Sequence, residues 1–580
     1  APAKPIAQAS GKIDPATLGA DFGIPLPDLS NGEYEVVMEL INPEGKVEDT
    51  RTVPFARRKY PWEGNAIGKD KVVIPPFTPL VVEGARIRPW GRAYTIGKSG
   101  LPASIVHTGD ELLAEPIRLE ATEGGKLLEL AGATLKVQPA DGAGHSVVVE
   151  SEGALGSLPV AVHGVMEYDG FYLVTLDMKP AAPVTLDRLD LVIPLWEAAD
   201  LALVKRSDGL HGSCMGAFPR GDGAVWDSRK LGKHGSWGAF APIVFAGTGD
   251  KALMWEAEAM DGWNTDTESA CVVLERSVGR PQVRIRMFHK PTVVDKPRSI
   301  RFALRATPTK PMKANWRGIA WRYPNEQLAL SSNLGYRWYG DGVNSFTLPR
   351  DEDFLGLRKV YAAPWPIDEN VKSRRYCTVG GEPFRQGKPL ILYGSNMGAG
   401  MAMKELETYC GEWLGGPWPE NPAPEAQKGD WNQQETLQWN EPRQLCAAFV
   451  NVCDSYVDCY LWNYQKYVSL SGVQGTWWDN GSVFTVWSPE KGTGQPVHRW
   501  NVFQRRTFIK RLATMCWQAG KEPYWEEGMG MEVSFNTLNW LIENDFYLPS
   551  DTTFYEYLPM DTLRALTAVR RGLITSLYPQ

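Results

Sequence analysis

The sequence predicts a multidomain protein in which a large β-sandwich precedes a TIM-like (β/α)8 barrel. Residues 33–305 contain many short runs of β-branched and aromatic residues separated by turn signals, which is typical of an all-β domain. The Pro-containing segment 307–311 interrupts this pattern. Beyond it, strand-like and helix-like stretches alternate through the rest of the 580 residues, as in a parallel α/β fold.

The first half divides into a tail, a small β unit and the sandwich. Residues 1–32 are rich in Ala, Pro and Gly, and we group this linker with a small β unit as the segment 1–58. The sandwich is assigned to residues 59–307. Its clearest strands alternate with period two or are rich in β-branched and aromatic residues; they are 146–150, 171–176, 283–288 and 300–305.

Residues 308–580 are expected to form the catalytic barrel. Its clearest helices, where apolar residues recur at helical spacing, are 456–469 and 500–518. Fewer than the eight strands of a closed barrel are recognised. The predicted strands are 334–339, 390–393, 447–451, 475–479, 523–525 and 573–577, and the other predicted helices are 352–361, 401–407, 534–543 and 560–571.

Composition argues against several classes of function. The net charge is −7, from 61 basic and 68 acidic residues, so a broad nucleic-acid surface is not expected. No apolar run approaches about 18 residues, so no membrane span is expected. The chain begins at Ala1 without an initiator Met, and we expect a secreted or periplasmic protein whose signal peptide has been removed. No cofactor is expected, and the oligomeric state is left open.

Tryptophan and histidine are unevenly distributed. Sixteen of the 23 Trp residues follow residue 300, whereas His498 is the single His in that part of the sequence. A zinc site needs His or Cys ligands at close spacing, and a Ser–His–Asp hydrolase needs an imidazole base. Neither fits the second half, so no metal is expected there. Carboxylates remain as the acid and base groups of a barrel site, with Trp residues as its walls.

Asp479 is the first candidate for such a group. It ends the predicted strand 475–479, and the C-terminal ends of the strands form the active face of a barrel. Asp479 would act as a nucleophile or orient a substrate group, whereas the structural alternative is an Asx turn that caps the strand. Trp477 and Trp478 would stack on sugar rings or pack between barrel and helices, and Asn480 follows in the turn as a further substrate-binding candidate.

Glu526 and Glu527 are the second candidates. They follow Tyr524 at the end of the next predicted strand. Neighbouring carboxylates repel, so the one that faces the site should have a raised pKa, which suits a general acid. Strand alternation turns only one of them inward, and the sequence leaves open which one. The alternative is a solvated acidic loop.

Further substrate-binding candidates come from the other strand ends. Asp341 and Tyr339 lie at the end of the first predicted strand of the barrel, and Asp454 follows the third. Tyr524, which lies just before the glutamate pair, is a further substrate-binding candidate. Tyr339 or Tyr524 would also serve as the base of a polysaccharide lyase, which is a third possible function.

Five segments carry a resemblance to known proteins. They are Tyr60–Asn65, Val73–Pro79, Trp90–Arg92, Phe302–Pro311 and Gly475–Asp479. The first four resemble the N-terminal domain of glycoside hydrolase family 123-like bacterial proteins, and the last resembles a segment of their barrel. The similarity covers most of residues 33–580 and is more specific in the first half. It implies a β-sandwich followed by a catalytic (β/α)8 barrel that acts on glycans.

The resemblance also implies a chemistry. Family 123 acts on β-linked N-acetylgalactosamine by a substrate-assisted route. In that family the Asp of an adjacent Asp-Glu pair orients the 2-acetamido group, and the Glu is the general acid/base. Here the matching strand end reads Asp479-Asn480, so Asp479 alone is carried over. Glu526 or Glu527 is then the candidate acid.

We therefore expect a secreted glycoside hydrolase that cleaves a poly- or oligosaccharide with a carboxylate pair, Asp479 with Glu526 or Glu527. An N-acetylhexosaminidase-like activity is implied by the resemblance. Retention and inversion both remain open, because the separation of the carboxyl groups decides between them. The alternative is a non-catalytic glycan-binding or structural surface protein with a degenerate barrel, which Asn480 and the missing eighth strand favour.

Overall fold

The computed structural model describes the first half of the chain almost continuously and the second half in separate segments. The described residues are 5–13, 19, 24, 26–205, 213–232, 238–266, 268–311, 329–332, 390–395, 398–400, 405–413, 438–440, 445–449, 452–468, 473–479, 485–489, 496–500, 502–521, 524–528, 540–546 and 573–577. Of the sequence predictions, the strand 334–339 and the helices 352–361 and 560–571 lie outside these residues.

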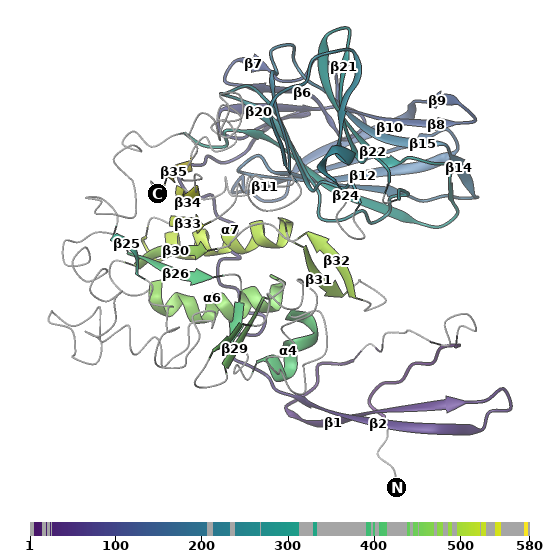
Figure 1. The fold of residues 1–580 in the computed structure, drawn as a ribbon, viewed down its shortest axis with the longest axis vertical. Helices are drawn as coiled ribbons and strands as arrows, with labels where there is room; N and C mark the ends of the chain where they lie inside the picture. Colours follow the sequence, from purple (N-terminus) through teal and green to yellow (C-terminus); the bar gives the residue numbers. More distant parts are fainter. Residues whose placement is uncertain are drawn as a thin grey trace.

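A two-stranded hairpin precedes the sandwich. Strand β1 (Gly32–Ile41) pairs antiparallel with β2 (Val47–Arg57). The side chain of Asn42 holds the turn, because it accepts hydrogen bonds from the backbone N–H groups of Glu44 and Lys46. Most of the hairpin is exposed, and Figure 1 shows it extended away from the sandwich. It occupies the region in which a small β unit is predicted.

The largest sheet of the sandwich has nine described strands, all antiparallel to their neighbours. Strand β24 lies at its centre and ends at Thr307, so the chain leaves the sandwich from the middle of this sheet. In spatial order the strands are β10 (Leu130–Pro139), β11 (Ser146–Leu155), β12 (Leu158–Glu167), β13 (Tyr172–Met178), β24 (Arg298–Thr307), β20 (Ala252–Glu256), β19 (Ile243–Gly247), β16 (Leu201–Lys205) and β17 (Ser213–Ala217).

Three smaller sheets and a 3-10 helix complete the sandwich. The six-stranded sheet has the order β18 (Gly223–Asp227), β21 (Val272–Ser277), β22 (Arg280–Phe288), β15 (Arg188–Pro194), β8 (Arg118–Glu123) and β9 (Lys126–Leu128). The five-stranded sheet contains β3 (Val81–Glu83), β4 (Arg86–Arg88), β5 (Arg92–Ile96), β6 (Pro102–His107) and β7 (Asp110–Glu111). The remaining elements are the pair β14 (Val184–Leu186) and β23 (Thr292–Val294), and the 3-10 helix η1 (Ser228–Leu231).

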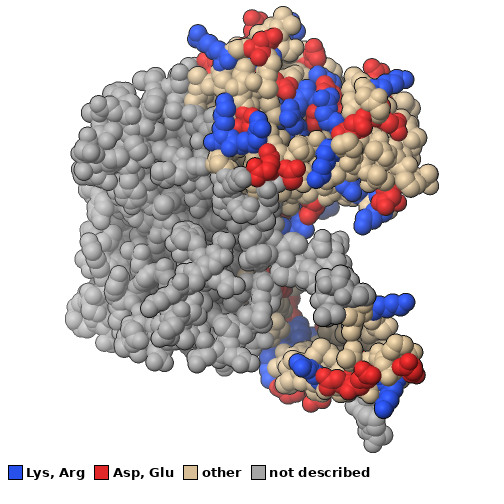
Figure 2. All heavy atoms as spheres, turned by 45° about the vertical axis from the view of Figure 1, so that its right-hand side comes forward, with Lys and Arg blue, Asp and Glu red and all other residues tan. Residues whose placement is uncertain are grey.

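The core of the sandwich follows the predicted alternation. Tyr172, Val174 and Leu176 of β13 are buried, as are Val283 and Ile285 of β22, and all five belong to one hydrophobic cluster. Burial of side chains of this size stabilises the fold by about 1.5–3 kcal/mol each. The four strands predicted most clearly from the sequence correspond to β11, β13, β22 and β24, and each lies within its strand except that the second begins one residue before β13. On the face drawn in Figure 2, basic and acidic side chains are interspersed over the sandwich.

In the described part of the second half, six parallel strands form the main sheet. Their spatial order follows the sequence, which is the order of a singly wound sheet, whereas a doubly wound sheet reverses its order at a switch point. The described strands therefore form a parallel α/β unit. They are β25 (Ala329–Ser332), β26 (Leu390–Ser395), β30 (Val473–Asp479), β33 (Tyr524–Gly528), β34 (Trp540–Phe546) and β35 (Leu573–Leu577).

Three α-helices belong to the described part of the second half, namely α4 (Leu406–Trp413), α6 (Asp454–Val468) and α7 (Val502–Gln518). Helix α6 precedes β30 and α7 precedes β33, as the sequence predicts. The two helices pack through an edge-on contact of Tyr460 with Phe508, whose ring centroids lie 5.1 Å apart. None of the described helices has the length and apolar character that crossing a membrane requires.

Two predicted elements differ from the structure. The apolar run predicted as a barrel strand at 447–451 is β29 (Leu445–Phe449), which pairs antiparallel with β27 (Gly398–Gly400) and β28 (Gln438–Asn440). Within the segment predicted as a helix at 534–543, the described residues 540–543 instead belong to the parallel strand β34. Short apolar runs do not by themselves distinguish a strand from a helix, and they do not specify which sheet a strand joins. A hairpin of β31 (Thr485–Pro489) and β32 (Pro496–Trp500) precedes α7.

Candidate active site at the edge of the parallel sheet

Asp479 is the last residue of β30, at the C-terminal edge of the parallel sheet. The register pairs Asp479 with Ser395, the last residue of β26, and with Gly528, the last residue of β33. Because the three strands are parallel, their C-terminal ends meet at one edge. This is the edge on which α/β proteins build their binding and catalytic sites.

The register also separates the two glutamates of β33. Glu526 pairs with Trp477, and Glu527 pairs with Trp478. Residues two apart along a strand share one face of a sheet, and laterally paired residues share that face as well. Asp479 and Glu526 therefore belong to one face, and Glu527 belongs to the opposite face.

The other predicted binding residues are distributed over both faces or fall outside the described chain. Tyr524 pairs with Gly475 and shares the face of Glu526, as does Trp477. Trp478 shares the face of Glu527. The predicted binding residues outside the described part of the chain are Tyr339, Asp341 and Asn480.

Two acidic residues in this sheet, Glu543 and Asp545 of β34, were missed by the sequence analysis. Glu543 of β34 pairs in register with Glu527, so β33 and β34 both carry acidic residues near their C-terminal ends. The segment was predicted as a helix, which removed Glu543 from consideration. The available signal was the aromatic and β-branched run Trp540–Ile542 directly before the acid, a composition that favours a strand.

Asp454 lies elsewhere than predicted. It is the first residue of α6, because the strand before it belongs to the antiparallel sheet and not to the parallel one. An acidic residue in the first turn of a helix is stabilised by the helix dipole. Asp454 also lines a cavity of about 240 Å³ between the sandwich and α7, together with Glu258, Arg301 and Phe503.

Glu258 connects the sandwich to the N-terminus of α7. Its side chain is 8% exposed and accepts hydrogen bonds from the backbone N–H of Phe503 at 2.8 Å and of Gln504 at 3.4 Å. It thus satisfies N–H groups that a helix terminus leaves without intrahelical partners. Burial raises the pKa of Glu258 to about 7, although these two N–H groups and the charge of Arg301 favour the ionised form.

Arg506 provides the charged centre of the same junction. It is buried and contacts Asp169 at 2.7 Å and Glu167 at 2.6 Å, while Lys510 contacts Glu167 at 2.9 Å. The Arg506 guanidinium also lies 3.9 Å from the ring centroid of Phe171. Burial alone would raise the pKa of Asp169, but the charges of Arg506 and other basic groups outweigh it and lower that pKa.

A second contact joins α7 to α6 and to the segment between β2 and β3. Arg511 of α7 pairs with Asp458 of α6 at 2.6 Å, and Lys69 pairs with the same carboxylate at 3.0 Å. The Arg511 Nε donates to the backbone carbonyl of Ile67 at 3.0 Å. Because α7 leads within a few residues into β33, these contacts fix the helix that precedes the strand of Glu526.

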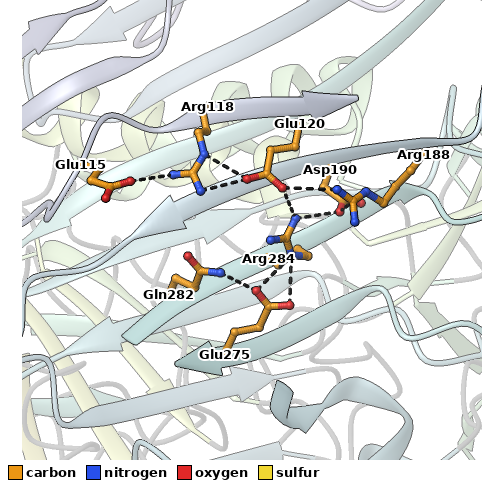
Figure 3. A network of polar contacts seen from close by, with 8 residues as sticks. All are labelled: Glu115, Arg118, Glu120, Arg188, Asp190, Glu275, Gln282 and Arg284. Carbon is orange, nitrogen blue, oxygen red and sulfur yellow. Dashed lines mark hydrogen bonds and ion pairs between the residues drawn. The ribbon is translucent and has the colours of Figure 1, made fainter. Parts of the chain in front are cut away.

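Glu120, Asp190 and Glu275 of the six-stranded sheet of the sandwich take part in a separate network (Figure 3). Arg284 contacts Glu120 at 2.6 Å, Asp190 at 2.9 Å and Glu275 at 3.0 Å, which joins four neighbouring strands. Burial raises the pKa of Asp190 and outweighs the effect of Arg284. Burial acts in the same direction on Glu120, but Arg284 and Arg118 together lower its pKa. These carboxyl groups are engaged with arginines, so we assign them a structural role.

The fold and the candidate site define a class of protein: a β-sandwich joined to a parallel α/β unit with acidic residues at its C-terminal strand edge. Residues 80–206, which span β3 to β16, match the family model of the third domain of glycoside hydrolase 123. The resemblance to glycoside hydrolase family 123-like proteins is thereby confirmed over that segment. No curated protein matches the sequence.

Several solved structures are similar to the chain at low sequence identity. GH36 α-galactosidase AgaA from Geobacillus stearothermophilus is 8% identical, with a TM-score of 0.36 and coverage of 85% of this chain and 78% of that one. The α-galactosidase from Lactobacillus brevis is 10% identical, with a TM-score of 0.33 and coverage of 93% and 75%. The α-N-acetylgalactosaminidase NagBb from Bifidobacterium bifidum, in complex with GalNAc, is 11% identical, with a TM-score of 0.27 and coverage of 85% and 84%. All three TM-scores are below 0.5, so no role is inferred for this chain from these structures.

Proposed function

We propose that the chain is a secreted glycoside hydrolase that cleaves a glycosidic bond of a poly- or oligosaccharide. The match of residues 80–206 to a glycoside hydrolase domain supports the reaction class. The sequential order of the parallel strands supports a TIM-like (β/α)8 barrel over residues 308–580, following a sandwich over residues 59–307. Both domain limits and the closure of the barrel are part of the proposal.

The proposed catalytic pair is Asp479 and Glu526. The observation that carries this choice is the register of β30 with β33, which assigns both residues to one face near the same strand edge. Glu526 would protonate the leaving oxygen, and ionised Asp479 would stabilise the oxocarbenium-like transition state or act as the nucleophile. Glu527, the alternative acid in the sequence, belongs to the other face and serves as a matched comparison.

The stereochemical outcome depends on the separation of the two carboxyl groups. A separation of about 5–5.5 Å favours retention through a covalent intermediate, and about 6.5–9.5 Å favours inversion with an activated water. A substrate-assisted N-acetylhexosaminidase route is the third possibility, in which Asp479 orients a 2-acetamido group. Hydrolysis of N-acetylated substrates alone would favour that route.

The experiment compares Asp479→Asn, Glu526→Gln and Glu527→Gln on a panel of glycans and aryl glycosides. We expect the first two substitutions to lower kcat by at least about 100-fold, the usual contribution of a general acid or base. Glu527→Gln controls for the loss of one carboxylate from the same strand. Full activity of the Asp479 variant or of the Glu526 variant would overturn the assignment of that residue.

A second candidate function is supported by one residue. The strand end reads Asp479-Asn480, where the family 123 pattern has an Asp-Glu pair, so the chain would bind glycans without cleaving them if no other acid takes part. Isothermal titration of the wild-type chain with the same glycan panel distinguishes the two functions. Binding without turnover on any glycan would support the non-catalytic function.

A further inference from the structure

An open groove on the sandwich shares no residue with the candidate active site. Its volume is about 660 Å³, and β4, the turn after it and parts of β5 and β6 contribute to its lining. The lining contains Arg86, Arg88 and Arg92 and no Asp or Glu. This local excess of positive charge occurs in a chain whose net charge is −7. The groove is therefore suited to an anionic ligand.

Strand alternation presents two of these arginines outward. Ile87 is fully buried, so Arg86 and Arg88 on either side of it share the exposed face of β4. Arg88 pairs with Glu83 at 2.8 Å, and their side chains are 44% and 50% exposed. Within the described part of the chain Arg86 forms no such ion pair. Its guanidinium can therefore offer a planar pair of donors to a carboxylate or sulfate group.

Trp90 is held at the edge of the groove by a fixed turn. The Arg92 N–H donates to the Pro89 carbonyl at 3.2 Å, and the intervening Gly91 has φ +65°. The buried Arg92 side chain locks the turn, because its Nε donates to the Trp90 carbonyl at 3.0 Å. Its Nη1 donates to the carbonyls of Asp169 at 2.9 Å and Ala306 at 2.8 Å. Trp90 itself remains partly exposed.

We propose that this groove is an accessory binding site for an anionic oligosaccharide. The indole of Trp90 would pack against the C–H face of a pyranose ring, and Arg86 and Arg88 would pair with its carboxylate or sulfate groups. Trp supplies a large apolar surface at low entropic cost, and Arg supplies two parallel hydrogen bonds to an oxyanion. The site goes beyond the proposed hydrolase activity, because binding here requires no residue of the strand edge.

The test is isothermal titration of the full chain carrying Asp479→Asn, so that turnover does not consume the ligand. The probes are an oligogalacturonate, a sulfated galactan oligosaccharide of equal length, a neutral galactan oligosaccharide and sodium sulfate. We expect one or both anionic oligosaccharides to bind, with the neutral one at least tenfold weaker. Preference for the first identifies carboxylate recognition, and preference for the second identifies sulfate recognition.

Three substitutions locate the binding. Arg86→Ala and Trp90→Ala should each raise the Kd for the anionic oligosaccharide at least tenfold. Arg280→Ala is the matched control, because it removes an exposed arginine of the same domain outside the groove, and it should stay within twofold. Trp90→Phe keeps an aromatic ring, so it should bind the anionic oligosaccharide more tightly than Trp90→Ala does. That result would show that the loss in Trp90→Ala comes from the missing ring and not from a disturbed turn. Circular dichroism of each variant verifies that it is folded.

Three results would overturn the proposal. The first is no binding of either anionic oligosaccharide. The second is binding that Arg86→Ala and Trp90→Ala both leave unchanged, which would assign it to another site. The third is binding of sodium sulfate as tight as that of the oligosaccharides, which would define an anion site without sugar recognition. Failure of the wild-type chain to hydrolyse glycans would contradict the proposed function and leave this groove unaffected.

Discussion

Asp169 of the sandwich accepts a hydrogen bond from Arg506 of α7 at 2.7 Å, across 337 positions of sequence, and both side chains are buried. The helix that leads into the strand of Glu526 is thus attached to the sandwich by a charge pair removed from water. In such an environment an unpaired charge is costly. We infer that the sandwich helps to position α7, and through it the strand β33 that carries Glu526.

Arg506→Met should destabilise the protein strongly. It removes the cation that Asp169 and Glu167 face, and breaking one side of a buried ion pair typically costs about 3–5 kcal/mol. Urea unfolding followed by tryptophan fluorescence measures the change in the free energy of unfolding. The double variant Arg506→Met with Asp169→Asn should lose less than the sum of the single variants, because the two residues interact. Additive losses would mean that the pair is not coupled.

Gly68 and Gly64 provide a matched test of the contact between α7 and the segment between β2 and β3. Their φ angles are +68° and +63°, so alanine strains the backbone similarly at both. A Cβ at residue 68 would meet the backbone of Arg511, with its Cα 2.8 Å away, whereas a Cβ at residue 64 would meet nothing within 4 Å. Gly64→Ala should cost about 1–2 kcal/mol and Gly68→Ala at least about 1 kcal/mol more. Equal shifts in the unfolding midpoint would contradict this packing.

Local patterns in the sequence were sufficient for helices α6 and α7 and for several strands. The helix predicted at 500–518 is α7 (Val502–Gln518), because apolar residues recur with the helical period along it. Asp479 could likewise be placed at a strand end from its neighbours. Local pattern could not assign β34, where Trp540–Ile542 reads as either a helix segment or a buried strand. It also could not distinguish Glu526 from Glu527, since only pairing with β30 defines the shared face.

The ion pairs at the junction of sandwich and helices lacked a sequence signal for a different reason. Arg506 and Asp169 are distant in sequence, and a charged residue is more often solvated than buried. The retrospective signal is the set of basic residues Arg505, Arg506 and Arg511 within a helix whose other residues are largely apolar. Such a pattern indicates that buried partners exist, but it does not identify them.

The register of β30 and β33 leads to a prediction about the two glutamates. Glu526→Gln should lower kcat on the best substrate by at least about 100-fold, whereas Glu527→Gln should lower it less than tenfold. If Glu526 is the general acid, its substitution should also abolish the alkaline limb of the kcat/KM profile, and substrates with a good leaving group should lose less activity. The reverse order of the two variants would assign the acid to the opposite face of the sheet.

The stability of the protein should depend on pH through Glu258. Its pKa is raised from 4.5 to about 7 in the folded protein, so the unfolded chain releases this proton at lower pH than the folded chain. The stabilisation from the protonated carboxyl is complete below about pH 4.5 and is lost as the pH rises through about 7. Glu258→Gln keeps an uncharged oxygen that can accept from Phe503 and Gln504. Its unfolding free energy should lie within about 0.5 kcal/mol of the wild type at pH 4.5 and exceed it by about 3 kcal/mol at pH 8.

Urea unfolding of both proteins from pH 4.5 to pH 8 measures this difference. Glu44→Gln is the control, because Glu44 is an exposed carboxylate in the turn of the N-terminal hairpin, and it should leave the pH dependence unchanged. If the curves of Glu258→Gln and wild type are parallel, Glu258 is ionised in the folded protein at every pH tested. Its bonds to the first turn of α7 would then outweigh the cost of burying the charge. A difference that grows with pH would instead show that α7 begins on a neutral carboxyl group below pH 7.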